Sequence, residues 1–144
     1  MRIAVDFDGT IVEHKYPYIG KEIPFAIDTL KRLAEERHKL VLWTVREGRL
    51  LDEAVAFCKE RGLEFYAINQ DEPDNVPVKS NHRSRKLKVD LFIDDRNVGG
   101  LPDWGMIYEM ISHKMTYEEL LKDPNRDYDD DSKGGFFSRL FGRK

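Results

Sequence analysis

The sequence has one cysteine, Cys58, among its 144 residues, and this excludes an internal disulfide. It has no apolar run that approaches the roughly 20 residues needed to cross a bilayer. It has no basic excess either, because 24 Lys and Arg face 27 Asp and Glu, and the net charge of −3 gives no overall attraction for nucleic acid. We expect no signal segment, since Met1 and Arg2 lead directly into an apolar strand. These absences predict a cytoplasmic protein that binds no nucleic acid and has no stable membrane insertion.

The composition is that of a soluble globular protein, with 35% charged and 40% hydrophobic residues. The chain is long enough for one domain with a substantial core, which we expect over residues 1–122. Cys58 shares a predicted helix face with Leu51, Ala54 and Val55. Because free cysteines are often interior, we expect Cys58 to be a buried packing residue.

Short apolar strands alternate with helical patterns along the chain. Strands are predicted over 2–7, 39–44, 63–68 and 87–94, and helices over 24–34, 48–61 and 116–121. Residues 106–111 fit either element, and we favour a last strand there. Such alternation predicts an α/β protein with a three-layer Rossmann-like fold and a mainly parallel sheet. Residues 9–22 and 69–85 are predicted to be loops, the first of them a small flap.

Acidic side chains follow two of the predicted strands. Asp6 and Asp8 come at the end of the first, and Asp94 and Asp95 at the end of the fourth, while Thr44 ends the second. In a parallel sheet these carboxyl ends meet at one edge, where ligands bind. Clustered carboxylates repel one another unless a cation lies between them, and oxygen ligands suit Mg²⁺. Capping and turn formation are the alternative reading, but they do not explain why apolar strands end in paired acids.

This set of residues is suited to phosphoryl transfer. A carboxylate at the end of the first strand can attack phosphorus, and a second carboxyl two residues later can exchange a proton with the leaving group and with water. The Thr44 hydroxyl and nearby backbone N–H groups can hold phosphoryl oxygens. A lysine would offset the negative charge of the carboxylates and the phosphate.

The ordered motifs resemble those of the haloacid dehalogenase-like (HAD) superfamily. Asp6-Phe7-Asp8-Gly9-Thr10-Ile11-Val12 resembles its first motif, Leu42-Trp43-Thr44 its second, and Phe92-Ile93-Asp94-Asp95 its fourth. The third motif is a lysine before the last acidic strand, for which Lys86 is our choice, with Lys88 and Lys79 as alternatives. A charged stretch such as 80–88 is equally typical of a solvated surface.

The resemblance implies a role for each matching residue. Asp6 would be the nucleophile and a Mg²⁺ ligand, and Asp8 the general acid and base, with its backbone carbonyl on the metal. Thr44 and Lys86 would bind the phosphoryl group, and Asp94 with Asp95 would complete the metal site. The acid at the position of Asp8 makes this motif similar to that of the phosphatase and phosphotransferase branches of the superfamily.

The intervals between the motifs are too short to contain a cap domain. The chain therefore resembles small capless phosphatases, which act on large substrates or close the site with a neighbouring subunit, so a homo-oligomer is one expectation. Thr44-Val45-Arg46 is similar to members acting in capsule or sugar-phosphate metabolism. Arg46 would contact substrate or phosphate, with a surface arginine at a helix start as the equal alternative.

The sequence therefore predicts a Mg²⁺-dependent hydrolase of a phosphate monoester that acts through an aspartyl-phosphate. We expect a small phosphorylated molecule such as a sugar phosphate or nucleotide as the substrate, and a phosphoprotein stays an open alternative. One alternative is a non-catalytic phosphate-binding or regulatory module on the same fold. Another is a phosphotransferase or phosphomutase, which shares the chemistry. A receiver domain is disfavoured, because the strand that would carry its phosphorylated Asp ends in Thr44.

The C-terminal residues 123–144 form a separate segment in the sequence. An acidic, Pro-containing linker precedes a short amphipathic stretch with Phe136, Phe137, Leu140 and Phe141 on one face. We expect this stretch to pack on its own domain or on a neighbouring subunit rather than on a membrane, because so short a helix binds lipid weakly.

Overall fold

The computed structural model describes residues 1–77 and 84–122. The chain divides into two compact units, 1–101 and 102–144. The predicted linker and amphipathic stretch at 123–144, and the alternative lysine Lys79, lie outside the described residues.

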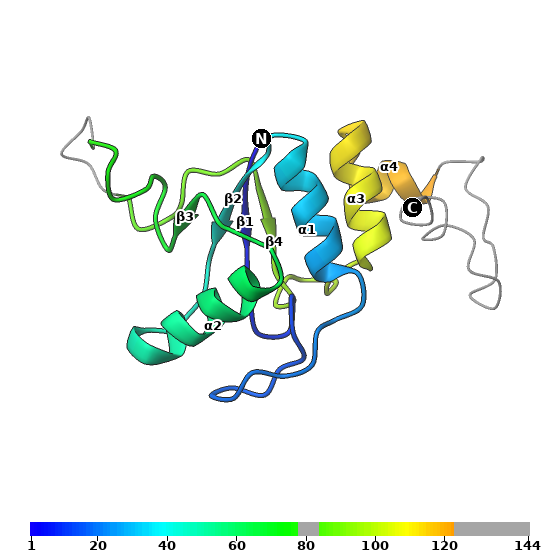
Figure 1. Cartoon of the computed structure of the whole chain (residues 1–144). Coiled ribbons are helices and arrows are strands. Elements are labelled where there is room, and N and C mark those ends of the chain that lie inside the picture. The colour runs from blue at the N-terminus through cyan, green and yellow to red at the C-terminus, as the bar shows by residue number, and fades with distance from the viewer. Residues whose placement is uncertain (78–83, 123–144) are drawn as a thin grey trace. The chain divides into compact units, whose positions relative to one another are not determined.

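A parallel sheet of four strands forms the centre of the first unit within the described residues (Figure 1). Its strands are β1 (Arg2–Val5), β2 (Lys39–Leu42), β3 (Ala67–Ile68) and β4 (Leu91–Ile93), in the order β3-β2-β1-β4. The predicted parallel α/β, Rossmann-like fold is confirmed, although each strand is shorter than expected. Because every pairing is parallel, the carboxyl ends of all four strands lie along one edge.

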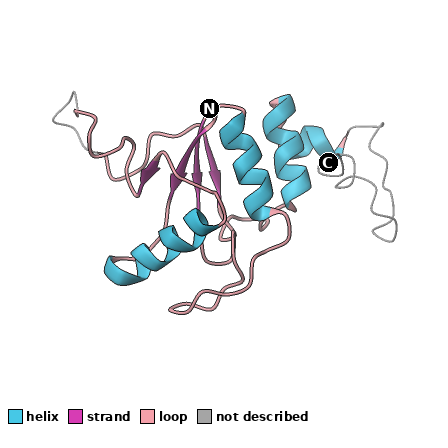
Figure 2. Cartoon of the chain, in the orientation of Figure 1, coloured by secondary structure: helices cyan, strands magenta, loops and turns pink. Residues whose placement is uncertain are grey.

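The helices α1 (Ala26–Glu35) and α2 (Gly48–Glu60) connect consecutive strands of this sheet (Figure 2). Each is amphipathic: Leu30 and Leu33 of α1 are fully buried, as are Ala54 and Cys58 of α2. The prediction that Cys58 is a buried packing residue is confirmed. Burial is also the main cause that raises the pKa of its thiol to about 12, so the group stays protonated.

The second unit contains α3 (Trp104–His113) and α4 (Tyr117–Leu121) among its described residues. The strand favoured over 106–111 is therefore wrong. The side chain of Asp103 caps α3 by accepting a hydrogen bond from the Met106 backbone N–H at 2.9 Å. Buried side chains recur at helical spacing along α3, at Trp104, Ile107, Tyr108 and Ile111. The six residues 106–111 contain only part of that pattern, which is why a strand fitted them as well.

The predicted helix over 116–121 is confirmed, together with its capping box. The Thr116 hydroxyl accepts from the Glu119 backbone N–H, and the Glu119 carboxylate accepts from the Thr116 backbone N–H. No helix in the described part of the chain combines the length and the hydropathy needed to cross a bilayer.

Candidate functional site

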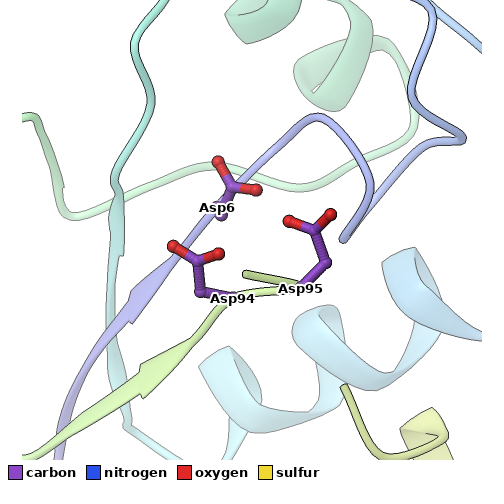
Figure 3. A group of neighbouring side chains, drawn as sticks. All are labelled: Asp6, Asp94 and Asp95. Atoms are coloured by element: carbon purple, nitrogen blue, oxygen red, sulfur yellow. The ribbon is translucent and has the colours of Figure 1, made fainter. Parts of the chain in front are cut away.

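Three carboxylates meet at the carboxyl edge of the sheet. Asp6 directly follows β1, and Asp94 and Asp95 directly follow β4, which is hydrogen-bonded to β1. One oxygen from each carboxylate lies within 4.8 Å of the others, and all three residues are half-buried. Figure 3 shows the three side chains turned toward a common space. The structure thus brings together three of the acids selected from the sequence.

The electrostatics of this cluster are unfavourable without a cation. Burial is the largest cause that raises the pKa of Asp6, and the nearby charge of Asp94 adds to it. Hydrogen bonds from the Phe7 backbone and the Thr10 hydroxyl act in the opposite direction. The net result is a pKa of about 7, compared with the ordinary value of 3.8. A positive charge in this space would therefore favour the ionised form of Asp6 and lower its pKa.

Thr10 joins the two strand ends that carry the acids. Its buried hydroxyl donates a hydrogen bond to Asp6 Oδ2 at 3.1 Å and accepts one from the Asp95 backbone N–H at 3.1 Å. On the other side of the cluster, Asp94 Oδ1 accepts from the Arg96 backbone N–H at 2.8 Å. The Thr10 bonds thus tie the Asp6 carboxylate to the backbone at the end of β4, and the Arg96 bond holds the Asp94 carboxylate within its own turn.

The donor set fits a hard divalent cation. Asp95 Oδ1 is buried and has no hydrogen-bond partner among the described residues. A buried carboxylate oxygen without a partner is costly, and a metal ion would satisfy it. Three carboxylates from two adjacent strand ends form the kind of oxygen-rich set that binds Mg²⁺. The residues therefore fit the metal that the sequence predicts, and the identity of the ion stays a prediction.

Asp8 lies apart from this triad and is bound by Arg46. The guanidinium donates from Nε to Asp8 Oδ2 and from Nη2 to Asp8 Oδ1, each at 2.7 Å. Asp8 is 7% exposed and Arg46 is fully buried, so Arg46 is not the surface arginine that the sequence left open. The hydrogen bond to Asp8 is also the main cause that raises the pKa of Arg46. The role of the Asp8 backbone carbonyl as a metal ligand stays a prediction.

Thr44 follows β2 at the same edge and is half-buried. Its backbone N–H donates to Asn69 Oδ1 at 2.8 Å, and its hydroxyl accepts from the Arg46 backbone N–H at 3.2 Å. Asn69 directly follows β3 and was missed by the sequence analysis. Its place at the carboxyl end of a strand, within a predicted loop, was the signal that could have identified it.

Among the described residues, neither Lys86 nor Lys88, the candidates for the third motif, forms a hydrogen bond or ion pair with the acidic triad. Lys86 and Lys88 are exposed. The backbone carbonyl of Lys88 accepts from the side chain of Arg2, which begins β1 at the edge of the sheet opposite Asp6. The role of Lys86 therefore stays a prediction.

The flap, residues 9–22, lies beside α2 and borders a groove of about 860 Å³. The groove is lined on the flap side by Pro17, Tyr18 and Ile19, and on the α2 side by residues that include Leu50, Ala56 and Phe57. Elsewhere in the flap, His14 Nε2 lies 3.5 Å from the Arg96 guanidinium. The flap thus contacts both the α2 wall and the loop that follows β4.

The fold and the site define a class: a parallel α/β protein with an acidic cluster that could hold a metal ion. A conserved protein coded by a locus of Bacteroides thetaiotaomicron has a solved structure similar to this chain. The two are 63% identical over 85% of this chain and 98% of the other, with a TM-score of 0.79. The chain belongs to the same family as that conserved protein. No family model and no curated protein matches the sequence.

Proposed function

We propose that this protein is a Mg²⁺-dependent phosphate monoester hydrolase, a capless phosphatase of the HAD-like kind, and that it acts through an aspartyl-phosphate at Asp6. The observation that carries the proposal is the convergence of Asp6, Asp94 and Asp95 at the carboxyl edge of a parallel sheet. This edge is where parallel α/β folds bind ligands. The unsatisfied buried oxygen of Asp95 supports a cation at this point rather than a set of surface acids.

In the proposed reaction, a carboxylate oxygen of Asp6 attacks the phosphorus of the substrate, and the bond from phosphorus to the leaving-group oxygen breaks. Asp8, in its protonated form and with one oxygen released from Arg46, gives a proton to that oxygen as it departs. Asp8 then takes a proton from a water molecule that attacks the aspartyl-phosphate, which releases inorganic phosphate and restores Asp6. When bound, Mg²⁺ would offset the charge of the carboxylates and polarise the phosphoryl oxygens.

The phosphoryl group would be held by the Thr44 hydroxyl and by backbone N–H groups beyond β1 and β2. The backbone of Thr44 is held in place by Asn69, which supports this role. Lys86 is proposed as the cation that contacts the phosphoryl group, and a sugar phosphate or a nucleotide as the substrate. A homo-oligomer in which a neighbouring subunit closes the site is proposed on the same resemblance to capless phosphatases.

Phosphate release from a panel of phosphate monoesters, with and without Mg²⁺, tests the proposal. Wild type, Asp6→Asn and Asp52→Asn are compared, because Asp52 is an exposed residue of α2 and serves as a matched control. We expect Mg²⁺-dependent turnover that Asp6→Asn abolishes and Asp52→Asn leaves unchanged.

Two results would count against the proposal. Turnover that survives in Asp6→Asn would remove Asp6 as the nucleophile. An absence of turnover from folded protein that binds Mg²⁺ would favour the phosphate-binding module, unless phosphate is transferred to an added sugar acceptor, which would favour a phosphotransferase.

A further inference from the structure

Arg46 is a wholly buried arginine at the point where three segments meet. Its backbone N–H contacts the Thr44 hydroxyl after β2, and its guanidinium binds Asp8 after β1. The same guanidinium donates from Nη1 to the Pro17 carbonyl at 3.1 Å and from Nη2 to the Tyr18 carbonyl at 3.0 Å. One side chain therefore connects the proposed acid and base with the flap.

The donors of this guanidinium are almost fully used by the protein. An arginine has five N–H donors, and four bonds run from Arg46 to Asp8, Pro17 and Tyr18. A substrate phosphate could therefore form a paired contact with Arg46 only if existing bonds were broken. This count favours a role in positioning other groups over direct binding of phosphate.

Two aromatic rings lie near the guanidinium. Its central carbon lies 5.2 Å from the centroid of the Phe7 ring and 5.3 Å from that of Tyr16. Phe7 stands between Asp6 and Asp8 in the chain and packs edge-to-face on Phe57 of α2. The orientation of the guanidinium is thus set by the flap, by the strand end and by α2 together.

The orientation of the guanidinium sets that of the Asp8 carboxylate, because both carboxylate oxygens are bound to Arg46. We propose that Arg46 is a positioning residue of the proposed phosphatase reaction: by binding both Asp8 oxygens and the flap carbonyls of Pro17 and Tyr18, it makes correct placement of the acid depend on seating of the flap. This inference rests on the proposed function, since it concerns the acid of that reaction.

The test compares two phosphate esters whose leaving groups differ in how much they need protonation. Values of kcat/KM are measured with p-nitrophenyl phosphate, whose leaving group needs little protonation, and with an alkyl phosphate, whose leaving group needs it. The variants are Arg46→Gln, Arg46→Lys, Asp8→Asn and Asp8→Asn with Arg46→Gln. Arg61→Gln is the control, because Arg61 binds the flap residue Glu22 and does not bind Asp8.

We expect Arg46→Gln to lower kcat/KM for the alkyl phosphate by about 100-fold, with a much smaller loss for the aryl phosphate. Asp8→Asn should give the same selective loss, and the double variant should be no worse than Asp8→Asn alone. Arg46→Lys should recover part of the loss, and Arg61→Gln should show no selective effect. Equal losses for both substrates, or losses that add to that of Asp8→Asn, would overturn the proposal.

Amide hydrogen exchange gives a second readout that needs no turnover. Arg46→Gln should accelerate exchange in the flap and leave α1 unchanged, and Asp8→Asn should do the same to a smaller extent, because coupling is reciprocal. Unchanged flap exchange in Arg46→Gln would overturn the link to the flap. If wild type turns over none of the monoesters of the panel, the proposed function fails, and the exchange data still decide whether Arg46 joins Asp8 to the flap.

Discussion

Gly9 leaves the space that the Asp95 carboxylate fills: a Cβ atom at Gly9 would lie 2.3 Å from Asp95 Oδ2. The two residues come from different strand ends, so this close approach brings the β4 acids up to the chain that follows β1. Gly9 also has a φ of +86°, which residues with a side chain rarely adopt. The residue is thus required twice, for its backbone conformation and for the carboxylate beside it.

Gly9→Ala should displace the Asp95 carboxylate and lower the affinity for Mg²⁺ by at least about tenfold, the size of effect seen when the groups around a metal ligand are altered. Titration calorimetry measures this. Gly99→Ala is the matched control, because Gly99 has a similar φ of +93° but no atom within 4 Å of the added Cβ. Equal Mg²⁺ affinity in the two variants would show that the contact with Asp95 does not matter.

The raised pKa of Asp6 predicts how pH affects the metal-free protein. Below the ordinary value of 3.8 the group is protonated in both folded and unfolded chains, and it contributes no penalty. Between 3.8 and about 7 the folded state retains the proton that the unfolded state has lost. The free energy of unfolding of the metal-free protein therefore decreases as the pH rises through that range.

Mg²⁺ competes with the proton on Asp6, so its stabilising effect should increase with pH and level off above about 7. Thermal unfolding with EDTA and with Mg²⁺, at about pH 5 and about pH 8, measures the difference. Asp6→Asn should remove most of this pH dependence. A shift of Tm with Mg²⁺ that is the same at both pH values in wild type would contradict the prediction.

Replacing Arg46 with Met should destabilise the metal-free protein by about 3–5 kcal/mol, because a buried carboxylate loses its partner. Urea unfolding in EDTA measures this change. Combined with Asp8→Asn, the same substitution should cost clearly less than the sum of the single variants. Additive losses would mean that the two side chains do not stabilise each other.

Asn69→Gly should lower kcat/KM of the proposed reaction by about tenfold, because the backbone N–H of Thr44 loses its acceptor. Glycine tolerates the φ of +52° at this position, so backbone strain does not contribute. Asn75→Gly, in an exposed turn, is the control and should leave kcat/KM unchanged. Steady-state kinetics with one ester and saturating Mg²⁺ would decide the question, and wild-type activity in Asn69→Gly would refute it.

The parallel fold and the acidic triad could be predicted because both depend on backbone periodicity. Apolar strands ending in acids place Asp6, Asp94 and Asp95 at one sheet edge, whatever the side-chain details. The α3 helix was missed because 106–111 is too short a window. The stronger signals lay before this window, in the helix cap Asp103 and the buried Trp104.

The partner of Arg46 could not be predicted from the sequence. Asp8 lies 38 positions away, and the ion pair depends on the flap carbonyls and on rings whose positions follow from tertiary packing. The acceptor role of Asn69 was missed for a related reason, since it depends on β3 lying beside β2. Side chains that bind other side chains are set by the completed fold, whereas strand-end residues are set by the pattern.

Asp6 is the group that becomes phosphorylated in the proposed reaction. Asp8→Asn, which should slow hydrolysis of the intermediate, is mixed with Mg²⁺ and p-nitrophenyl phosphate, quenched in acid and digested with pepsin at acidic pH, where an acyl phosphate survives. Mass spectrometry then examines the peptide that contains Asp6. We predict Mg²⁺-dependent phosphorylation of this peptide, with fragmentation that places the phosphate on Asp6. Turnover without a phosphorylated Asp6 would contradict the account.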